Sequence, residues 1–492
     1  MQDRIVLISM MIMLLANLTL CSCDSSTSSS KGSIVGTILL DGETDHSGIV
    51  VSIYNARNVP TELSQVLEEY PQLSFQLDSK VIFDHREQDA LHTALTNADG
   101  KFSFDDIPYS DYIITYRKEG WGYNNYFNIE LNESELYLGD NNPLKLYHEV
   151  SLPGLIEGDF TLESDKCYVA TNDVVIASGA QMIMQSNSRL LLNQYVKIIT
   201  QGNLVGPESP LRAYITSSAG IHSGGFSNAD LADGVHILSD NSSIENMSFS
   251  YLGTGLKVSG DSHDLHRLAF QNCVFGLVIN AASDIELSHC LFSGNKDINA
   301  AACYAYDVQG LSARSNIFYS NYIAHKHEIV KDAVVENNAY INNDRAYLNL
   351  WESTADFRYN DLRSDGVAIE NSGRSNLSIT YNNIESKVGV KTYHTNNWYN
   401  SINNGWTKAN NNNIIASQLA VESRARYYYY DAPAYPLDFK NNYWGTTSQT
   451  EIADLVLDYH ELGSGPPEWV YSEVVYLPFR LHRVDNAGIQ PE

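Results

Sequence analysis

The residues best suited to chemistry lie between positions 365 and 394, where Asp365, Glu370, Lys391, Tyr393 and His394 follow one another. Elimination from a uronate polysaccharide needs a basic side chain that removes a proton next to a carboxylate. It also needs positive charge that neutralises this carboxylate, which a calcium ion held by acidic side chains can supply. One hypothesis is therefore a polysaccharide lyase with Lys391 as base, Glu370 or Asp365 beside it, and calcium as cofactor.

The same residues also fit a solvated surface, as do Asp344 and Arg345, which lie near them in the repeat described below. The chain has 31 basic and 59 acidic residues and a formal net charge of −28, which opposes an unassisted polyanionic substrate. Because phosphate contacts need clustered Lys and Arg, this balance also excludes a general nucleic-acid-binding protein. The prediction therefore leans against an enzyme and assigns no catalytic residue, and the lyase is kept as the alternative.

Aromatic residues near the C-terminal end form the strongest binding-like feature of the sequence. Trp398, Tyr399 and Trp406 lie in an Asn-rich stretch, Tyr428 lies in the run RYYYYD, and Tyr393 is close in sequence. Aromatic faces stack on sugar rings, and Asn side chains both donate and accept hydrogen bonds. These residues predict a glycan site, although half of such a run could equally face a core.

Histidine and cysteine give no metal site. His325 and His327 alternate along a predicted strand and would share one face, but no third ligand can be identified. The cysteines of the folded part are too widely spaced for a CxxC zinc site, so we expect buried free thiols. They are Cys167, Cys273, Cys290 and Cys303.

The N-terminus predicts export. Residues 5–15 form an apolar run behind Arg4 that is too short to span a bilayer, and Leu20-Cys21-Ser22-Cys23 follows it. This ending resembles a bacterial lipobox, which implies a signal peptide over residues 1–22 and acylation of Cys23. Residues 23–31 are Ser-rich and predict a flexible tether. The expected location is the cell envelope, at the outer membrane or cell surface rather than the inner membrane, and the alternative is an ordinary secretory signal.

Residues 32–150 predict a small β-domain, because short alternating runs are bounded by Gly and Asp turns. Asp99-Gly100 before Phe102 and Phe104 predicts a tight hairpin. The segments DHSGIVVSI, TNADGKFSFDDIP and DYIITYRKEGW resemble the carboxypeptidase-regulatory-like domain, which implies an immunoglobulin-like β-sandwich without catalytic residues. An insertion between Asn58 and Leu91 contains TELSQVLEEY, whose apolar spacing predicts a helix.

Residues 151–449 carry a repeat. Asn316, Asn338, Asn360 and Asn382 are each 22 residues apart, in the strings SNIF, NNAY, YNDL and YNNI. A period near 22 predicts stacked coils of a parallel β-solenoid, about 13 of them and roughly 60 Å long. Equivalent asparagines would form a ladder, since Asn tolerates the left-handed turn conformation and can bond to the coils above and below. His289 is expected at the corresponding place upstream.

Alternation within the repeat predicts which side chains face inward. Leu348 and Leu350 are expected inside, whereas Asn349 and Lys391 are expected outside. The repeats resemble the right-handed parallel β-helix of pectate-lyase-like proteins. The ending DFKNNYWGTTSQTEIADLVLD resembles their terminal coil, which implies a C-terminal cap over residues 450–492 with a short helix begun by Thr or Ser.

The sequence thus predicts an all-β protein, a right-handed parallel β-helix preceded by a small immunoglobulin-like β-sandwich. The expected function is that of a lipid-anchored surface binding or adhesion protein, with a glycan as partner and no cofactor. The alternatives are the uronate lyase and a purely structural stalk.

Overall fold

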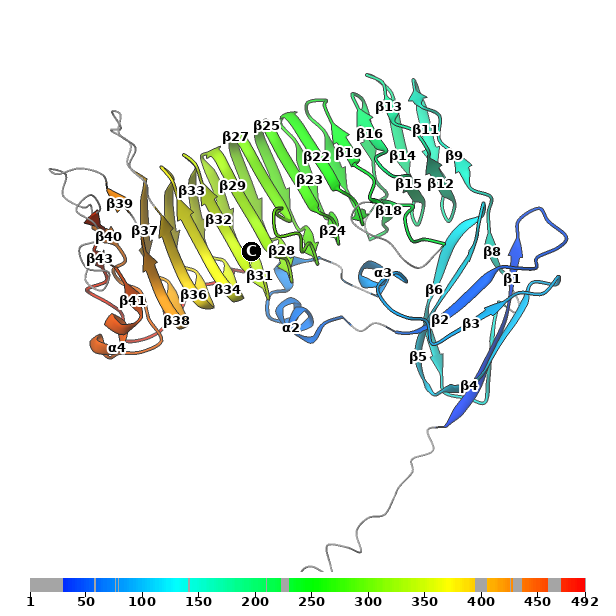
Figure 1. Ribbon diagram of the computed structural model, residues 1–492, viewed down its shortest axis with the longest axis horizontal. Coiled ribbons are helices and arrows are strands. Elements are labelled where there is room, and N and C mark those ends of the chain that lie inside the picture. The colour runs from blue at the N-terminus through cyan, green and yellow to red at the C-terminus, as the bar shows by residue number, and fades with distance from the viewer. Residues whose placement is uncertain are drawn as a thin grey trace, which may run out of the picture.

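A computed structural model describes residues 30–56, 59–75, 77, 79–139, 142–208, 210–222, 230–393, 405–424, 426–427, 436–458 and 470–491. Two small β-sheets lie at one end of a long parallel β-solenoid, and an insertion from the small sheets lies against the side of the solenoid (Figure 1). No helix among the described residues has the length and apolar character needed to cross a membrane.

The two small sheets share one hydrophobic core, to which Ile34, Ile53, Phe102 and Ile114 belong. One sheet has the order β4-β1-β7 with β8 beside β1, and the other has the order β3-β2-β5-β6. Their strands are β1 Lys31–Leu40, β2 Val50–Asn55, β3 His92–Leu95, β4 Lys101–Pro108, β5 Ser110–Lys118, β6 Gly122–Leu131, β7 Glu135–Leu138 and β8 Leu144–Leu146.

The predicted Asp99-Gly100 hairpin is only half right. The turn is present, with Gly100 at φ +76°, and Phe102 and Phe104 alternate into the core. However, β3 pairs with β2 and β4 pairs with β1, so the turn carries the chain from one sheet to the other. Core packing between the sheets therefore decides the pairing, which a turn signal alone does not specify.

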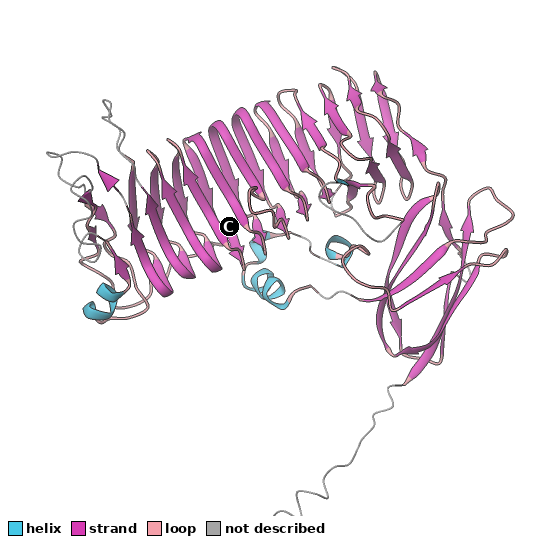
Figure 2. Cartoon of the chain, viewed as in Figure 1, coloured by secondary structure: helices cyan, strands magenta, loops and turns pink. Residues whose placement is uncertain are grey.

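The insertion (residues 59–90) leaves β2 and returns to β3. It contains α2 Thr61–Glu69, the 3-10 turn η1 Pro71–Leu73 and α3 Ser79–Ile82. The predicted helix is thus confirmed, and its buried residues Leu63 and Val66 pack with Ile317 of the solenoid in one hydrophobic cluster. Figure 2 shows these helices beside the solenoid strands.

The solenoid has about 11 turns of parallel strands, fewer than the 13 expected. The period of 22 underestimates coil length, because the equivalent residues Asn382, Asn412 and Asn442 are 30 residues apart. The strands are β9 Val150–Ser151, β10 Leu155–Ile156, β11 Asp159–Leu162, β12 Cys167–Ala170, β13 Val174–Ile176, β14 Gln181–Met184, β15 Arg189–Leu192, β16 Lys197–Thr200, β17 Asn203–Val205, β18 Ala213–Ser217, β19 Gly234–Ile237, β20 Ser243–Glu245, β21 Met247–Ser250, β22 Thr254–Asp261, β23 Asp264–His266, β24 Ala269–Gln271, β25 Phe275–Ser288, β26 Leu291–Ser293, β27 Cys303–Arg314, β28 Ile317–Tyr319, β29 Ile323–Lys331, β30 Ala333–Glu336, β31 Ala339–Ile341, β32 Arg345–Leu350, β33 Thr354–Arg358, β34 Asp361–Ser372, β35 Asn376–Thr380, β36 Asn383–Tyr393, β37 Trp406–Asn410, β38 Asn413–Ser423, β39 Arg426–Tyr427, β40 Leu437–Asp438, β41 Val456–Leu457, β42 Val470–Tyr471 and β43 Val474–Val475.

The asparagine ladder is confirmed. The ladder residues are fully buried: Asn316, Asn338, Asn360 and Asn382. In the last three, the side-chain Oδ1 accepts the backbone N–H and the side-chain Nδ2–H of the equivalent asparagine in the preceding coil, at 2.9–3.0 Å. Asn316 Oδ1 accepts only a backbone N–H, that of Cys290. The ladder continues through Asn412 and Asn442.

The predicted conformational role of these asparagines is wrong. The left-handed residue is the one before each of them, namely Ser315, Asn337, Tyr359 and Tyr381, with φ between 54° and 58°. His289 likewise has φ 53° and lies one residue before the ladder position, which Cys290 occupies. The ladder asparagines therefore contribute hydrogen bonds, while their neighbours make the turn.

Stacked aromatic rings fill the core of the solenoid. The rings of Phe249, Phe270, Phe292, Phe318 and Tyr340 follow one another at centroid separations of 5.2, 4.9, 4.7 and 4.7 Å. All are fully buried, so each coil closes its inner face only against the next one. The four cysteines Cys167, Cys273, Cys290 and Cys303 are buried and unpaired, as predicted.

The face assignment at β32 is wrong. Tyr347 and Asn349 are fully buried inside the solenoid, where Asn349 Nδ2 donates to Asn371 Oδ1 at 2.9 Å, so Leu348 and Leu350 point outward. Lys391 does point outward, beside Val390 in the core.

A short helix, α4 Gln449–Asp454, follows the last described ladder residue. Its N-cap is Ser448, whose hydroxyl accepts the backbone N–H of Glu451 at 3.3 Å, as expected for a helix begun by Ser.

Candidate functional site

The predicted glycan residues fall in two groups. Trp398, Tyr399 and Tyr428 lie outside the described residues, as does His394. Trp406 opens β37 and is 45% exposed, and Tyr393 is half-buried at the end of β36. These two aromatic side chains therefore remain part of a candidate surface.

The predicted lyase residues lie close together but are engaged in ion pairs. Glu370 and Lys391 are register partners on adjacent strands. Lys391 Nζ lies 3.4 Å from a carboxylate oxygen of Glu422 and 5.0 Å from the ring centroid of Tyr393. Glu370 pairs with Arg345, and Asp365 is exposed. Among the described residues, no three His, Cys, Asp or Glu side chains converge as a metal site would require.

His325 and His327 share a face as predicted, but it is the inner face. Both are fully buried, with their Nε2 atoms 3.0 Å apart. His325 Nδ1 lies 3.2 Å from the Tyr340 hydroxyl, and His327 Nδ1 lies 2.9 Å from the Tyr347 hydroxyl. Two core tyrosines thus supply the hydrogen bonds that these buried histidines need.

We expect this histidine pair to make the solenoid sensitive to acid. Burial lowers the pKa of His325 to about 3 and holds the pKa of His327 well below its usual value. A depressed histidine pKa means that the unfolded chain binds more protons, so stability is full above about pH 6.5 and falls as the pH drops. The loss between pH 6.5 and 5.5 is about 1 kcal/mol per histidine.

Urea unfolding at these two pH values measures the loss. The variant H325Q/H327Q should show a shallower pH dependence, whereas H92Q, at an exposed position, should keep the parent slope. An unchanged slope in the double variant would contradict the assignment.

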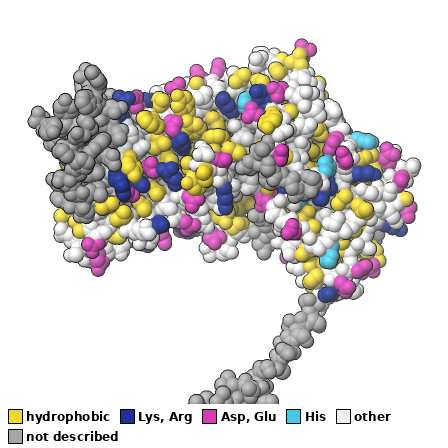
Figure 3. All heavy atoms as spheres, viewed as in Figure 1, with side chains coloured by type: hydrophobic (Ala, Val, Ile, Leu, Met, Phe, Trp, Pro, Cys, Tyr) yellow, Lys and Arg dark blue, Asp and Glu magenta, His cyan; other side chains and the backbone are white. Residues whose placement is uncertain are grey.

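The outward side of β27, β29, β32, β34 and β36 is here called the front face, and most of its side chains are half-buried. Two rows of side chains run across these strands in register. The first row is Tyr304, Lys326, Leu348, Glu370 and Lys391, and the second is Tyr306, Glu328, Leu350, Ser372 and Tyr393. Figure 3 shows hydrophobic side chains gathered on this face with basic and acidic ones between them.

Exposed aromatic rings lie at the first strand and beside the middle strand of the front face. Tyr306 is 39% exposed, and Trp351, directly after β32, is 64% exposed. Lys326 Nζ lies 4.8 Å from the centroid of Tyr304 and 2.7 Å from Glu328. Burial and the hydrogen bond to Glu328 at 2.5 Å raise the pKa of Tyr304, so its hydroxyl stays protonated. The surface therefore presents ring faces, hydroxyl groups and fixed charges.

Sequence reasoning missed most of the front face. Because Leu348 and Leu350 were placed inside, the outward direction of their rows was not recognised, although Leu348 is itself only 2% exposed. The inward-facing residues could have been recognised from the register of neighbouring coils. Tyr347 and Asn349 are register partners of Ile369 and Asn371 and continue their inward rows.

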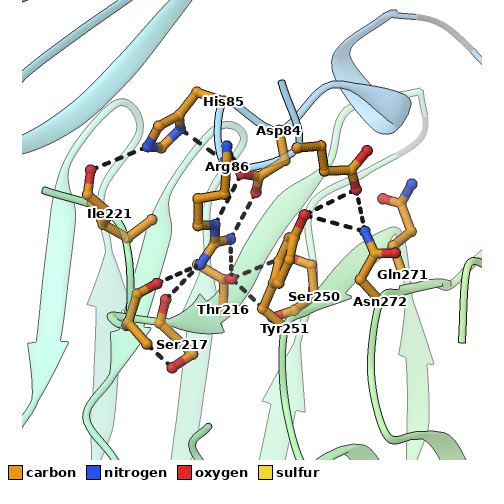
Figure 4. Close-up of polar contacts among 12 residues, drawn as sticks. Asp84, His85, Arg86, Thr216, Ser217, Ile221, Ser250, Tyr251, Gln271 and Asn272 are labelled. Atoms are coloured by element: carbon orange, nitrogen blue, oxygen red, sulfur yellow. Dashed lines mark hydrogen bonds and ion pairs between the residues drawn. The ribbon is translucent and has the colours of Figure 1, made fainter. Parts of the chain in front are cut away.

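The junction between the insertion and the solenoid is the second notable region. The Arg86 side chain reaches from the insertion to the solenoid wall (Figure 4). Its guanidinium donates to Asp84 at 2.7 and 2.9 Å, to the carbonyls of Ser217 and Ala219 at 3.1 Å, and to the Thr216 hydroxyl at 2.9 Å. Its Cζ also lies 3.8 Å above the Tyr251 ring.

The pairing of Arg86 with Asp84 determines the electrostatics of this contact. Burial alone would raise the pKa of Asp84, but the Arg86 guanidinium outweighs it and holds that pKa below its usual value. Glu87 accepts a hydrogen bond from the Tyr251 hydroxyl at 2.9 Å. Further along, the Tyr70 hydroxyl donates to Asp361 at 2.5 Å, and Arg363 pairs with Glu69 at 2.6 Å.

The insertion thus spans many coils. The strands that it contacts, β18 to β34, are joined by six successive pairings on one wall, a distance of about 29 Å at normal strand spacing. On the outer side of these strands lies a row of apolar residues that packs with the insertion in one hydrophobic cluster: Ala269, Leu291, Ile317 and Ala339.

Comparison with known proteins adds no relative. No protein-family model matches the chain, and no curated protein or solved structure matches it. Function is therefore argued from the solenoid and its surfaces alone.

Proposed function

We propose that this protein is an exported lipoprotein of the cell envelope that binds glycans through the front face of its solenoid. Cys23 would carry the lipid anchor, and residues 23–31 would form the tether. The small sheets would be an immunoglobulin-like sandwich of the carboxypeptidase-regulatory-like kind that acts as a spacer. The solenoid would be a right-handed β-helix of the pectate-lyase-like kind.

The observation that carries the proposal is a surface on which Tyr304, Tyr306 and Tyr393 lie in the two registered rows, with Lys326 and Glu328 between them. The exposed ring of Trp351 follows the end of β32 beside these rows. Strands about 4.8 Å apart repeat these side chains along a straight axis, which suits an extended polymer. Aromatic faces stack against sugar rings, and the charged groups between them provide directional hydrogen bonds. The exposed rings of Tyr306 and Trp351 are available for such stacking.

The lyase alternative has weaker support. Lys391 and Glu370 are neighbours, but each already has a partner of opposite charge, Glu422 and Arg345 respectively. A general base must approach the substrate proton within hydrogen-bonding distance. Lys391 would first have to leave Glu422, so the glycan-binding function is preferred.

Replacing Tyr306 and Trp351 by alanine should weaken binding to soluble polysaccharides by about tenfold, because each ring contributes roughly 0.5–1.5 kcal/mol beyond the area it buries. Affinity electrophoresis and glycan arrays with the protein lacking residues 1–23 measure this effect. The matched control is Y195A, which removes a 71% exposed tyrosine far from the front face in the sequence.

The same preparation is incubated with uronate polysaccharides, with and without calcium. New absorbance from unsaturated chain ends that is lost in K391A would replace the binding proposal by the lyase. If the protein neither bound nor cleaved any of these polysaccharides, the purely structural stalk would replace the binding proposal.

A further inference from the structure

A cleft of about 480 Å³ lies between the insertion, β6 and the first coils of the solenoid. Its lining includes Lys80, Tyr126, Asn128, Arg212 and Tyr214. This volume is within the range of sites for small molecules, and the lining combines ring faces with amide groups. The front face lies on other strands, so this is a separate surface.

The charge of the cleft is opposite to that of the chain. Among the described residues that line it, the charged ones are Lys80 and Arg212, and none is acidic. The chain as a whole has 59 acidic and 31 basic residues. Arg212 is held in place because its Nη1 donates to the carbonyls of Met247 and Arg267 at 3.2 and 3.0 Å, and its Cζ lies 4.9 Å above the Phe75 ring.

A smaller cavity of about 40 Å³ adjoins the cleft and shares Lys80 and Tyr214 with it. Arg189 lines this cavity and is 3% exposed, between the rings of Tyr123 and Tyr214 at 5.2 and 5.6 Å. Arg189 donates hydrogen bonds to Asn187 and forms no ion pair with any described residue. Asp84 and Glu87 also line this cavity, and Asp84 is paired with Arg86 at 2.7 Å. Arg189 has no such carboxylate partner among the described residues, so it adds positive potential to the cavity.

Two buried polar atoms of the small cavity have no hydrogen-bond partner, His85 Nδ1 and Ser248 Oγ. Asp84 Oδ1 lies 3.9 Å from His85 Nδ1, beyond hydrogen-bonding distance (Figure 4). Burial lowers the pKa of His85 to about 4, so the ring is neutral at pH 7. His85 Nε2 lies 3.1 Å from the Ile221 carbonyl and must donate to it, which leaves Nδ1 as an acceptor. An unsatisfied buried polar group costs about 1–3 kcal/mol, which a ligand hydroxyl could remove.

We propose that this cleft binds one anionic sugar residue, a hexose that carries a carboxylate or a sulfate ester. Lys80 and Arg212 bind the anionic group, the Tyr214 ring packs on the sugar, and hydroxyl groups reach His85 Nδ1 and Ser248 Oγ. The inference rests on the proposed function only in that the ligand is a glycan. It adds a second site with a defined ligand charge.

The test measures binding of four probes to the protein lacking residues 1–23 by calorimetry: methyl glucuronide, glucose 6-sulfate, methyl glucoside and sodium sulfate. At least one anionic sugar should bind tenfold more tightly than methyl glucoside and than sulfate alone. The tighter of the two anionic sugars identifies the group as carboxylate or sulfate ester. Equal binding of the neutral and anionic sugars, sulfate binding as tight as that of the sugars, or no binding would overturn the proposal.

Two variants locate the binding. Lys80 is exposed, so the K80Q variant should fold normally. Both K80Q and R212Q should weaken binding of the anionic sugar about tenfold. R374Q removes an arginine of an exposed ion pair elsewhere and should change nothing. Unchanged affinity in K80Q and R212Q at an unchanged melting temperature would overturn the proposal. Y306A/W351A should keep this site and lose only polymer binding, so failure of one proposal is distinguishable from failure of the other.

Discussion

Replacing Asn360 by alanine is expected to lower the free energy of unfolding by about 3–5 kcal/mol, the range for breaking a buried hydrogen-bond network. Asn360 is fully buried, and its Oδ1 accepts two hydrogen bonds from Asn338. Its Nδ2 donates to the carbonyls of Val335 and Arg358 and to Asn382 Oδ1, at 2.9–3.0 Å. Alanine removes all five of these side-chain hydrogen bonds, takes the acceptor from the buried Asn338 N–H and creates a cavity in the middle of the stack.

Urea unfolding followed by circular dichroism measures this effect. The control is N203A, which removes an exposed asparagine from β17 and should cost less than about 0.5 kcal/mol. N360D tests the donor side alone, because its carboxylate can accept but cannot donate to Val335 or Arg358. If N360A were as stable as the parent, the ladder would be a by-product of the repeat without a role in stability.

Replacing Arg86 by alanine is expected to destabilise the docked insertion by about 3–5 kcal/mol, because removal of one partner leaves the buried Asp84 charge without compensation. The same change removes the hydrogen bonds to Thr216, Ser217 and Ala219. Detachment exposes the backbone of residues 59–90, so limited proteolysis should cut there first. The solenoid fragment should stay resistant.

The matched control is R374A, which breaks the exposed ion pair with Glu352 and should leave the proteolysis pattern unchanged. The double variant D84N/R86A separates the two contributions, since it removes the uncompensated charge and should recover part of the loss. Equal protease resistance of R86A and the parent protein would show that the other contacts of the insertion hold it in place without Arg86.

The repeat was predictable because its signal is local. Constant spacing of Asn316, Asn338, Asn360 and Asn382 fixes the stacking of coils without knowledge of any distant contact. A second ladder, Asn295, Asn321 and Asn343, was missed because its first interval is 26 residues and only the next is 22. Irregular coil length therefore hides equivalent residues.

Other features depended on information that alternation does not contain. Around Leu348 the alternate positions Leu348 and Leu350 of β32 are apolar and the intervening Asn349 is polar, so hydrophobicity favoured the parity that in fact faces outward. His325 and His327 needed Tyr340 and Tyr347 from the next coil before a buried position became acceptable. The docking of the insertion is a contact between residues far apart in sequence, although the apolar face of α2 indicated that some partner was required.

The insertion has a mechanical consequence. It is a loop with both ends in the same small sheet, leaving from β2 and returning to β3, and it lies across about 29 Å of the stack. Tension that pulls the N-terminal sheets along the solenoid is therefore shared in shear by the contacts at Tyr70, Arg86 and Glu87 at the same moment. If the small sheets contacted the solenoid only at one end, these contacts would break one after another. Because the insertion lies along the side of the solenoid, we expect the protein to bear tension before the small sheets separate from it.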